Sequence, residues 1–162
     1  MPSILACVDF SDATDAVARE AARQAGPAGT LHLLHVAAAE PALVGYDRDE
    51  LPGAAAEQHT REARAAELTD EHQRLRAMAD QLAAAADAED RGPLTVTPLV
   101  VMAEDDSVVG TIIHEADRLD VDTIVAGSHG HGVLHRIALG STSAALGHHA
   151  SRPVLLVPVG QR

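Results

Sequence analysis

The sequence alternates short apolar runs with longer stretches in which apolar residues recur at helical spacing. Five runs are rich in Val, Ile and Leu: SILACVDF, TLHLLHVA, LTVTPLVVM, DTIVAGS and PVLLVPV. They are almost continuously apolar, as expected for the strands of a parallel sheet that helices cover on both faces. Strands separated by helices are typical of repeated βαβ units. The pattern therefore predicts an α/β protein with a single doubly wound, five-stranded parallel sheet.

Four helices are expected between these strands. Ser11 or Asp12 can cap a first helix that runs to about Ala25. A long second helix and a third helix each show one apolar face, formed by Leu68, Leu75, Met78 and Leu82, and by Val109, Ile112, Ile113, Ala116 and Leu119. A short fourth helix begins near Ser141 and ends before Pro153. Residues 38–56 are expected to form a long exposed loop, and the charges of residues 54–90 a solvated helix face.

The composition narrows the classes of protein and partner. A chain of 162 residues with 46% hydrophobic residues is expected to form one domain, residues 1–162. The net charge of −12 and the presence of only two aromatic residues argue against nucleic acid as a partner. No apolar stretch is long enough to span a bilayer, and no basic leader precedes the first apolar run. We therefore expect no membrane association and a soluble, cytoplasmic protein.

Two further absences bear on chemistry. All twelve basic residues are arginines, and the missing lysine excludes the usual phosphate loop, whose lysine reaches the terminal phosphates. The single cysteine, Cys7, lies in an apolar run and has no partner for an intrachain disulfide. We expect Cys7 to be a small buried hydrophobic residue with no redox role.

The stretch GSHGHGVLHRIALGST, residues 127–142, is unusually rich in glycine and histidine. Gly127 ends the fourth expected strand, and Gly140 and Ser141 open the fourth helix. The first turn of a helix has unpaired N–H groups and a positive dipole end, which favour phosphate oxygens. Asp9 ends the first strand, and a carboxylate at a topological switch point accepts ribose hydroxyls in many such folds. The alternative is that these glycines merely cap and turn the chain; the combination of features favours a nucleotide site.

With these residues in view, the sequence resembles the universal stress proteins, whose ATP-binding members carry the pattern G-x2-G-x9-G-[S/T]. Gly127, Gly130, Gly140 and Ser141 match this pattern at every position. The segments VDFSD, LLHV and HHASRPVLLVPV extend the resemblance over essentially the whole chain.

The resemblance implies a sheet in the order 3-2-1-4-5 with ATP, accompanied by Mg²⁺, lying across the first and fourth strands. It implies that Val36 meets the adenine through its backbone. Asp9 and Gly127 would hold the ribose, and the phosphates would contact Gly130, Gly140, Ser141 and Thr142. One departure is His131, which stands where many relatives carry Arg or Lys, so charge there depends on pH. Arg136 either compensates for it or is a solvated loop residue.

Other functions find less support in the sequence. The histidines near residue 130 and at 148–149 are expected at the surface or at the ligand's edge, because a structural zinc site needs four ligands in a closed shell. The nearby candidates for a hydrolytic base are Asp9, Asp12 and the loop histidines, so slow or no ATP hydrolysis is expected. We favour a nucleotide-dependent stress-response switch that acts on an unknown protein partner, with a nucleotide-independent dimeric scaffold as the alternative. A homodimer is expected through the last strand, residues 153–159, at a sheet edge.

Overall fold

The computed structural model describes residues 1–37, 53–89, 92–103, 107–128 and 139–158. The expected five parallel strands are confirmed, and so is their order, β3-β2-β1-β4-β5. The strands are β1 (Ser3–Cys7), β2 (Thr30–Ala37), β3 (Thr95–Met102), β4 (Thr123–Gly127) and β5 (Val154–Val157). The helices are α1 (Thr14–Ala25), α2 (Gly53–Ala88), α3 (Val108–Arg118) and α4 (Ser141–His149).

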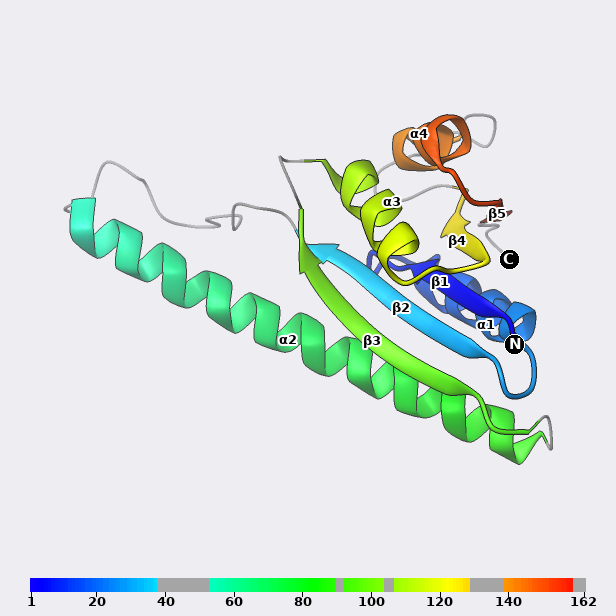
Figure 1. The fold of residues 1–162 in the computed structure, drawn as a ribbon. Coiled ribbons are helices and arrows are strands. Elements are labelled where there is room, and N and C mark those ends of the chain that lie inside the picture. Colours follow the sequence, from blue (N-terminus) through cyan, green and yellow to red (C-terminus); the bar gives the residue numbers. More distant parts are fainter. Residues whose placement is uncertain (38–52, 90–91, 104–106, 129–138, 159–162) are drawn as a thin grey trace.

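The sheet separates two layers of helices, which makes the fold doubly wound (Figure 1). On one face, α1 and α2 pack against the sheet through a core that includes Val17, Leu33 and Leu75. On the other face, α3 and α4 pack through a second core that includes Ile112 and Leu146. Each strand is therefore covered on both sides where the cores meet it, which explains the continuous apolar runs in the sequence.

The long helix α2 has 36 residues, which corresponds to about 54 Å at the usual rise per residue. Its N-terminal part extends beyond the sheet, and its C-terminal part lies along β3 (Figure 1). Leu75 is fully buried, and Met78 and Leu82 pack against the same core. The apolar face expected for this helix is thus confirmed in its C-terminal half.

Three local expectations need correction. Helix α1 begins at Thr14 with Ala13 at its N-cap and no side-chain cap, so the prediction that Ser11 or Asp12 caps it was wrong. The hydroxyl of Ser11 instead donates to the carboxylate of Asp9 over 2.5 Å, because the β1–α1 turn brings the two side chains together. Helix α2 begins at Gly53, inside the segment expected as a loop, and residues 38–52 lie outside the described residues. Cys7 is only partly buried.

The end of the chain follows the prediction more closely. Gly140 caps α4, and β5 lies at one edge of the sheet, paired only with β4 among the described strands. None of the helices in the described part of the chain is long and apolar enough to cross a membrane.

Candidate functional site

The site lies where the strand order reverses. β1 and β4 are neighbours in the sheet, yet β1 continues into α1 on one face, whereas α4 follows β4 on the opposite face. Their carboxyl ends therefore diverge and leave a crevice, the usual ligand position in open α/β sheets. A pocket of about 270 Å³ occupies this position. It is lined by Cys7, Val8, Asp9, Ala13, Thr14, Val17, Leu34, His35, Val36, Val108, Ile112, Ala126, Gly127, Gly140, Ser141, Thr142 and Ser143.

Six of the seven residues predicted for the site line this one pocket: Asp9, Val36, Gly127, Gly140, Ser141 and Thr142. The seventh, Gly130, lies outside the described residues, as do His129, His131, His135 and Arg136. The fold therefore brings together residues from four separate parts of the chain.

Asp9 follows β1 and is oriented by the turn that leads into α1. Its Oδ1 accepts hydrogen bonds from the Ser11 backbone N–H over 3.0 Å, from the Ser11 hydroxyl, and from the Thr14 hydroxyl over 3.4 Å. These bonds fix the direction of the carboxylate at the mouth of the pocket. A carboxylate held in this way is suited to accept hydrogen bonds from a polyol such as a ribose.

The first turn of α4 forms the opposite wall. The N–H groups of Ser141, Thr142 and Ser143 have no partner within the helix, and they carry the positive end of the helix dipole. Gly140 adds no side chain to this wall, and its own N–H is bound to the Ser128 carbonyl over 2.9 Å. The wall is suited to an anion even though none of the residues that line the pocket is Arg or Lys.

Ser143 differs from its two neighbours. Its side chain is buried, and its hydroxyl donates to the carbonyl oxygen of Gly127 over 2.6 Å. Ser141, Thr142 and Ser143 form a run of three hydroxyl residues, and all three line the pocket. Ser143, however, joins the start of α4 to the end of β4, which leaves Ser141 and Thr142 as the hydroxyl donors at the pocket.

Val36 contributes its backbone at the end of β2. The Leu34 carbonyl accepts a hydrogen bond from the N–H of Val8, so Leu34 directs its backbone groups toward β1. In a strand, residues two apart direct their backbone groups to the same neighbour, so the N–H and C=O of Val36 also face the β1 side. Backbone pairing of β1 with β2 ends at Cys7 and Leu34, and Leu34 lies two residues before Val36.

Several lining residues were not predicted. Val108 and Ile112 come from the first turns of α3, and Val108 remains 39% exposed. The apolar spacing of this helix indicated its core face. That its first turn borders the site follows only from the βαβ topology, in which every helix starts at the carboxyl edge of the sheet. His35 is another lining residue, and its place in an apolar strand gives no sign of this in the sequence.

Cys7 also lies on the pocket wall. Burial raises the pKa of its thiol to about 12, because the surroundings disfavour a charged thiolate. The raised pKa keeps the group a neutral thiol at neutral pH. Within the described residues, no cluster of three or more metal-ligating side chains occurs.

The fold and the site together define a doubly wound α/β protein with a ligand pocket at its switch point. The sequence matches the model of the universal stress protein family over residues 1–158, and the chain belongs to this family. No curated protein sequence matches it significantly.

Solved structures show the same fold at low sequence identity. The structure of hypothetical protein MJ0577 is 22% identical, with a TM-score of 0.73, over 99% of this chain and 97% of that one. A universal stress protein in complex with cAMP is 18% identical, with a TM-score of 0.57, over 97% and 96%. One from Archaeoglobus fulgidus in complex with dAMP is 18% identical, with a TM-score of 0.53, over 96% and 97%.

Proposed function

We propose that the pocket binds ATP together with Mg²⁺ and that the protein acts as a nucleotide-dependent switch in a stress response, with slow or no hydrolysis. One observation carries this proposal: the oriented carboxylate of Asp9, which follows β1, and the N-terminus of α4, which follows β4, face the same pocket. The Asp9 carboxylate can accept hydrogen bonds from the hydroxyls of a ribose, and the N-terminus of α4 can bind the phosphates. Their position in one pocket therefore matches a nucleotide. Two fold relatives, described above, are complexes with the adenine nucleotides cAMP and dAMP.

The pocket offers a contact for each part of ATP. The backbone of Val36 would meet the adenine, beside the apolar side chains of Val108 and Ile112. Asp9 and Gly127 would hold the ribose. The phosphates would lie against Gly140, Ser141 and Thr142, and we include Gly130 on the strength of the glycine pattern alone.

The residues that line the pocket are compatible with Mg²⁺ that is bound mainly by the nucleotide. Asp9 is the only carboxylate among the lining residues, and its Oδ1 already accepts from Ser11 and Thr14. Mg²⁺ commonly binds through substrate phosphates and water with few protein ligands. We therefore expect the triphosphate to supply most of its ligands, with the hydroxyls of Ser141 and Thr142 nearby.

The same lining argues for a switch over an efficient hydrolase. Phosphoryl transfer to water needs a residue that orients the attacking water and cations that stabilise the developing charge. The lining residues near α4 supply backbone N–H groups and hydroxyls, with no Arg or Lys. A bound nucleotide would connect β1, β2, β4 and α4 through one ligand. A protein partner would recognise the conformation that these elements adopt with the ligand bound.

We further propose a homodimer that pairs β5 of two chains at the free sheet edge. Ile124 and Ser128 of β4 donate to the carbonyls of Pro153 and Val157. Residues 153, 155 and 157 therefore direct their backbone toward β4, and residues 154, 156 and 158 direct theirs outward. Leu156 presents an outward N–H to a second chain, whereas Pro158 has none.

Calorimetric titration of ATP with Mg²⁺ tests the binding proposal. Nucleotide-free wild type is compared with a Gly130→Val, Gly140→Val double variant whose folding is verified by circular dichroism. We expect saturable binding by the wild type and a loss of at least about tenfold in the variant, since a side chain at these positions blocks the phosphates. Equal binding by both proteins would show that the two glycines do not contribute to the site. No binding by the wild type would favour a nucleotide-independent scaffold.

A further inference from the structure

A cluster of four side chains adjoins the pocket through His35, which also lines it, and lies between β2 and α2. It comprises His35 of β2, Phe10 of the β1–α1 turn, and Glu71 and Arg74 of α2. None of these residues was predicted to have a role. We refer to it as the His35 cluster.

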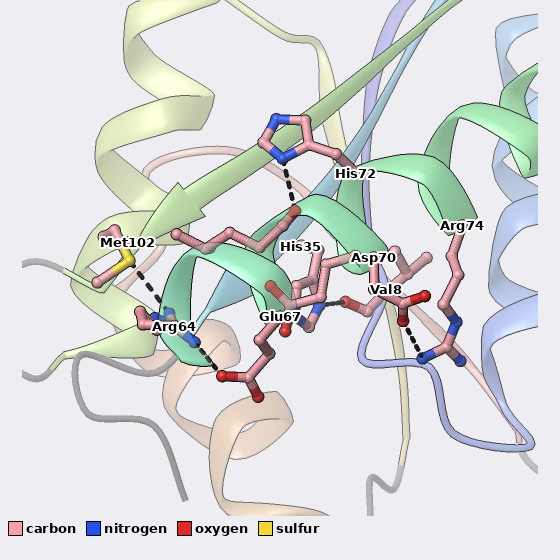
Figure 2. A network of polar contacts seen from close by, with 10 residues as sticks. Val8, His35, Arg64, Glu67, Asp70, His72, Arg74 and Met102 are labelled. Carbon is pink, nitrogen blue, oxygen red and sulfur yellow. Dashed lines mark hydrogen bonds and ion pairs between the residues drawn. The ribbon is translucent and has the colours of Figure 1, made fainter. Parts of the chain in front are cut away.

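His35 makes one contact through each ring nitrogen. Its Nδ1 lies 2.9 Å from the carbonyl oxygen of Val8, and its Nε2 lies 3.3 Å from Oε1 of Glu71. A carbonyl oxygen only accepts, so Nδ1 carries the proton and donates to Val8. Both side chains are nearly buried, with 11% of His35 and 13% of Glu71 exposed. Figure 2 shows the ring of His35 below α2 and directed at Val8.

The ring of His35 also contacts the ring of Phe10, at an interplanar angle of 44°. The Phe10 ring lies with its centroid 4.5 Å from that of His35, and the Arg74 guanidinium carbon lies 4.1 Å from the centre of the Phe10 ring. Phe10 has a backbone φ of 58°, in the left-handed region that bulky side chains rarely adopt. Such a conformation persists where surrounding contacts fix it, and here the contacts with His35 and Arg74 do so.

The hydrogen bond from His35 has a consequence for the strand pairing. Val8 donates its N–H to the Leu34 carbonyl, so a regular parallel ladder would next pair the Val8 carbonyl with the N–H of Val36. The ladder stops at Cys7 and Leu34, and the Val8 carbonyl accepts from the side chain of His35. The backbone groups of Val36 thus remain directed at the pocket.

We propose that His35, held by Glu71, is a positioning residue for base selection: its hydrogen bond directs the Val8 carbonyl at the His35 ring and away from the ladder, and so keeps the Val36 backbone available to the nucleotide base. This inference rests on the proposed nucleotide function. The N–H of Val36 can donate to the ring-nitrogen acceptor at the edge of adenine, and its C=O can accept from the adenine amino group. Guanine carries a donor and an acceptor in exchanged positions at this edge, so the same two backbone groups do not match it. Loss of His35 would let β1 and β2 pair by one more bond, which would withdraw the Val36 N–H from the base.

Two substitutions of similar size separate the contacts of His35. In His35→Asn the amide nitrogen takes the place of Nδ1 and can still donate to Val8, whereas in His35→Gln it takes the place of Nε2 and reaches toward Glu71. We expect the wild type and His35→Asn to prefer ATP over GTP by at least about tenfold, the value of one or two base hydrogen bonds. His35→Gln should bring this ratio close to one. An unchanged ratio in His35→Gln would overturn the proposal.

Glu71→Gln tests the support from α2, because it removes the negative charge that faces Nε2 while the shape of the side chain is kept. Its matched control is Glu67→Gln, which breaks the ion pair with Arg64 one turn earlier on the same helix. We expect the ATP to GTP ratio to fall in Glu71→Gln and to stay unchanged in Glu67→Gln. Equal effects of the two substitutions would indicate a general effect of α2 on stability and would contradict the proposed role.

Amide hydrogen exchange of the nucleotide-free protein separates this inference from the proposed function. We expect the Val36 amide to exchange rapidly in the wild type and more slowly in His35→Gln, where it pairs with the Val8 carbonyl. Slower exchange in the variant supports the positioning role even if ATP fails to bind. Equal exchange of Val36 in the two proteins would overturn it even if ATP binds.

Discussion

The hydroxyl of Ser143, in the first turn of α4, donates a hydrogen bond to the carbonyl oxygen of Gly127 at the end of β4, over 2.6 Å. The bond joins two residues that are 16 apart in the sequence and fixes the start of the helix against the strand that precedes it. The anion-binding end of α4 is thereby held at a defined distance from the switch point. A phosphate site needs its hydrogen-bond donors, here the N–H groups at the start of α4, to be held in fixed positions.

Ser143→Ala should destabilise the fold. The Gly127 carbonyl would lose its buried partner, at a cost of about 1–2 kcal/mol in the free energy of unfolding. Urea unfolding followed by circular dichroism measures this quantity. The control is Ser141→Ala, in the same turn but exposed, which should change stability by less than about 0.5 kcal/mol. Equal effects would show that the bond to Gly127 contributes nothing particular.

The thiol of Cys7 should react slowly in the folded protein. With a pKa of about 12, about one thiol in ten thousand is ionised at pH ~8, and the thiolate is the reactive form. The rate of reaction with a chromogenic disulfide reagent should therefore be far lower in the native protein than in urea. Because Cys7 lines the pocket, ATP with Mg²⁺ should lower the native rate further. A native rate equal to the unfolded rate would contradict the raised pKa of this thiol.

His32 should make stability depend on mildly acidic pH. Its Nδ1 is buried and has no hydrogen-bond partner among the described residues, and burial, followed by the charge of Arg118, lowers its pKa from 6.5. As pH falls through about 6.5, the unfolded chain takes up a proton that the folded chain does not, so the free energy of unfolding decreases. It levels off once the folded protein is protonated as well.

The substitution His32→Thr removes this group while a residue favoured in strands is kept. Between pH ~7 and pH ~5, unfolding free energies of this variant should fall less steeply than those of the wild type. Urea titrations at several pH values provide the comparison. Parallel curves for the two proteins would mean that His32 does not titrate differently in the folded and unfolded states.

Leu156→Pro tests the dimer. The substitution removes an outward N–H of β5 and leaves the bonds from Ile124 and Ser128 of β4 in place. Sedimentation velocity should show a dimer for the wild type and a larger monomer fraction for the variant, with unchanged circular dichroism. A variant that remains as dimeric as the wild type would exclude backbone pairing at Leu156.

Much of the fold could be predicted because its signals are local. Continuous apolar strands and helical periodicity were sufficient for five parallel strands and four helices, and the family resemblance supplied the strand order. Asp9 and Gly140 could be found since each stands at the junction of a strand or a helix with a turn. Their meeting in one pocket follows from the parallel topology, which gathers the carboxyl ends of the strands at one edge.

The remainder depends on contacts between distant segments. Ser11 was expected to cap α1, but whether a hydroxyl near a helix start faces the helix or a neighbouring carboxylate depends on the path of the turn. His35 reads as one more residue of an apolar strand until α2 places Glu71 beside it. The positive φ of Phe10 likewise has no signal in a sequence that lacks glycine at this position.

The proposal that this pocket binds ATP is tested most directly by amide chemical shifts of isotope-labelled protein during a titration with ATP and Mg²⁺. We predict saturable shifts at the amides of Val36, Gly127, Ser141 and Thr142, which come from three separate elements and share one pocket. The exposed amides of α2 should remain unchanged. An absence of saturable shifts at these four amides, or shifts confined to another surface, would contradict the proposal.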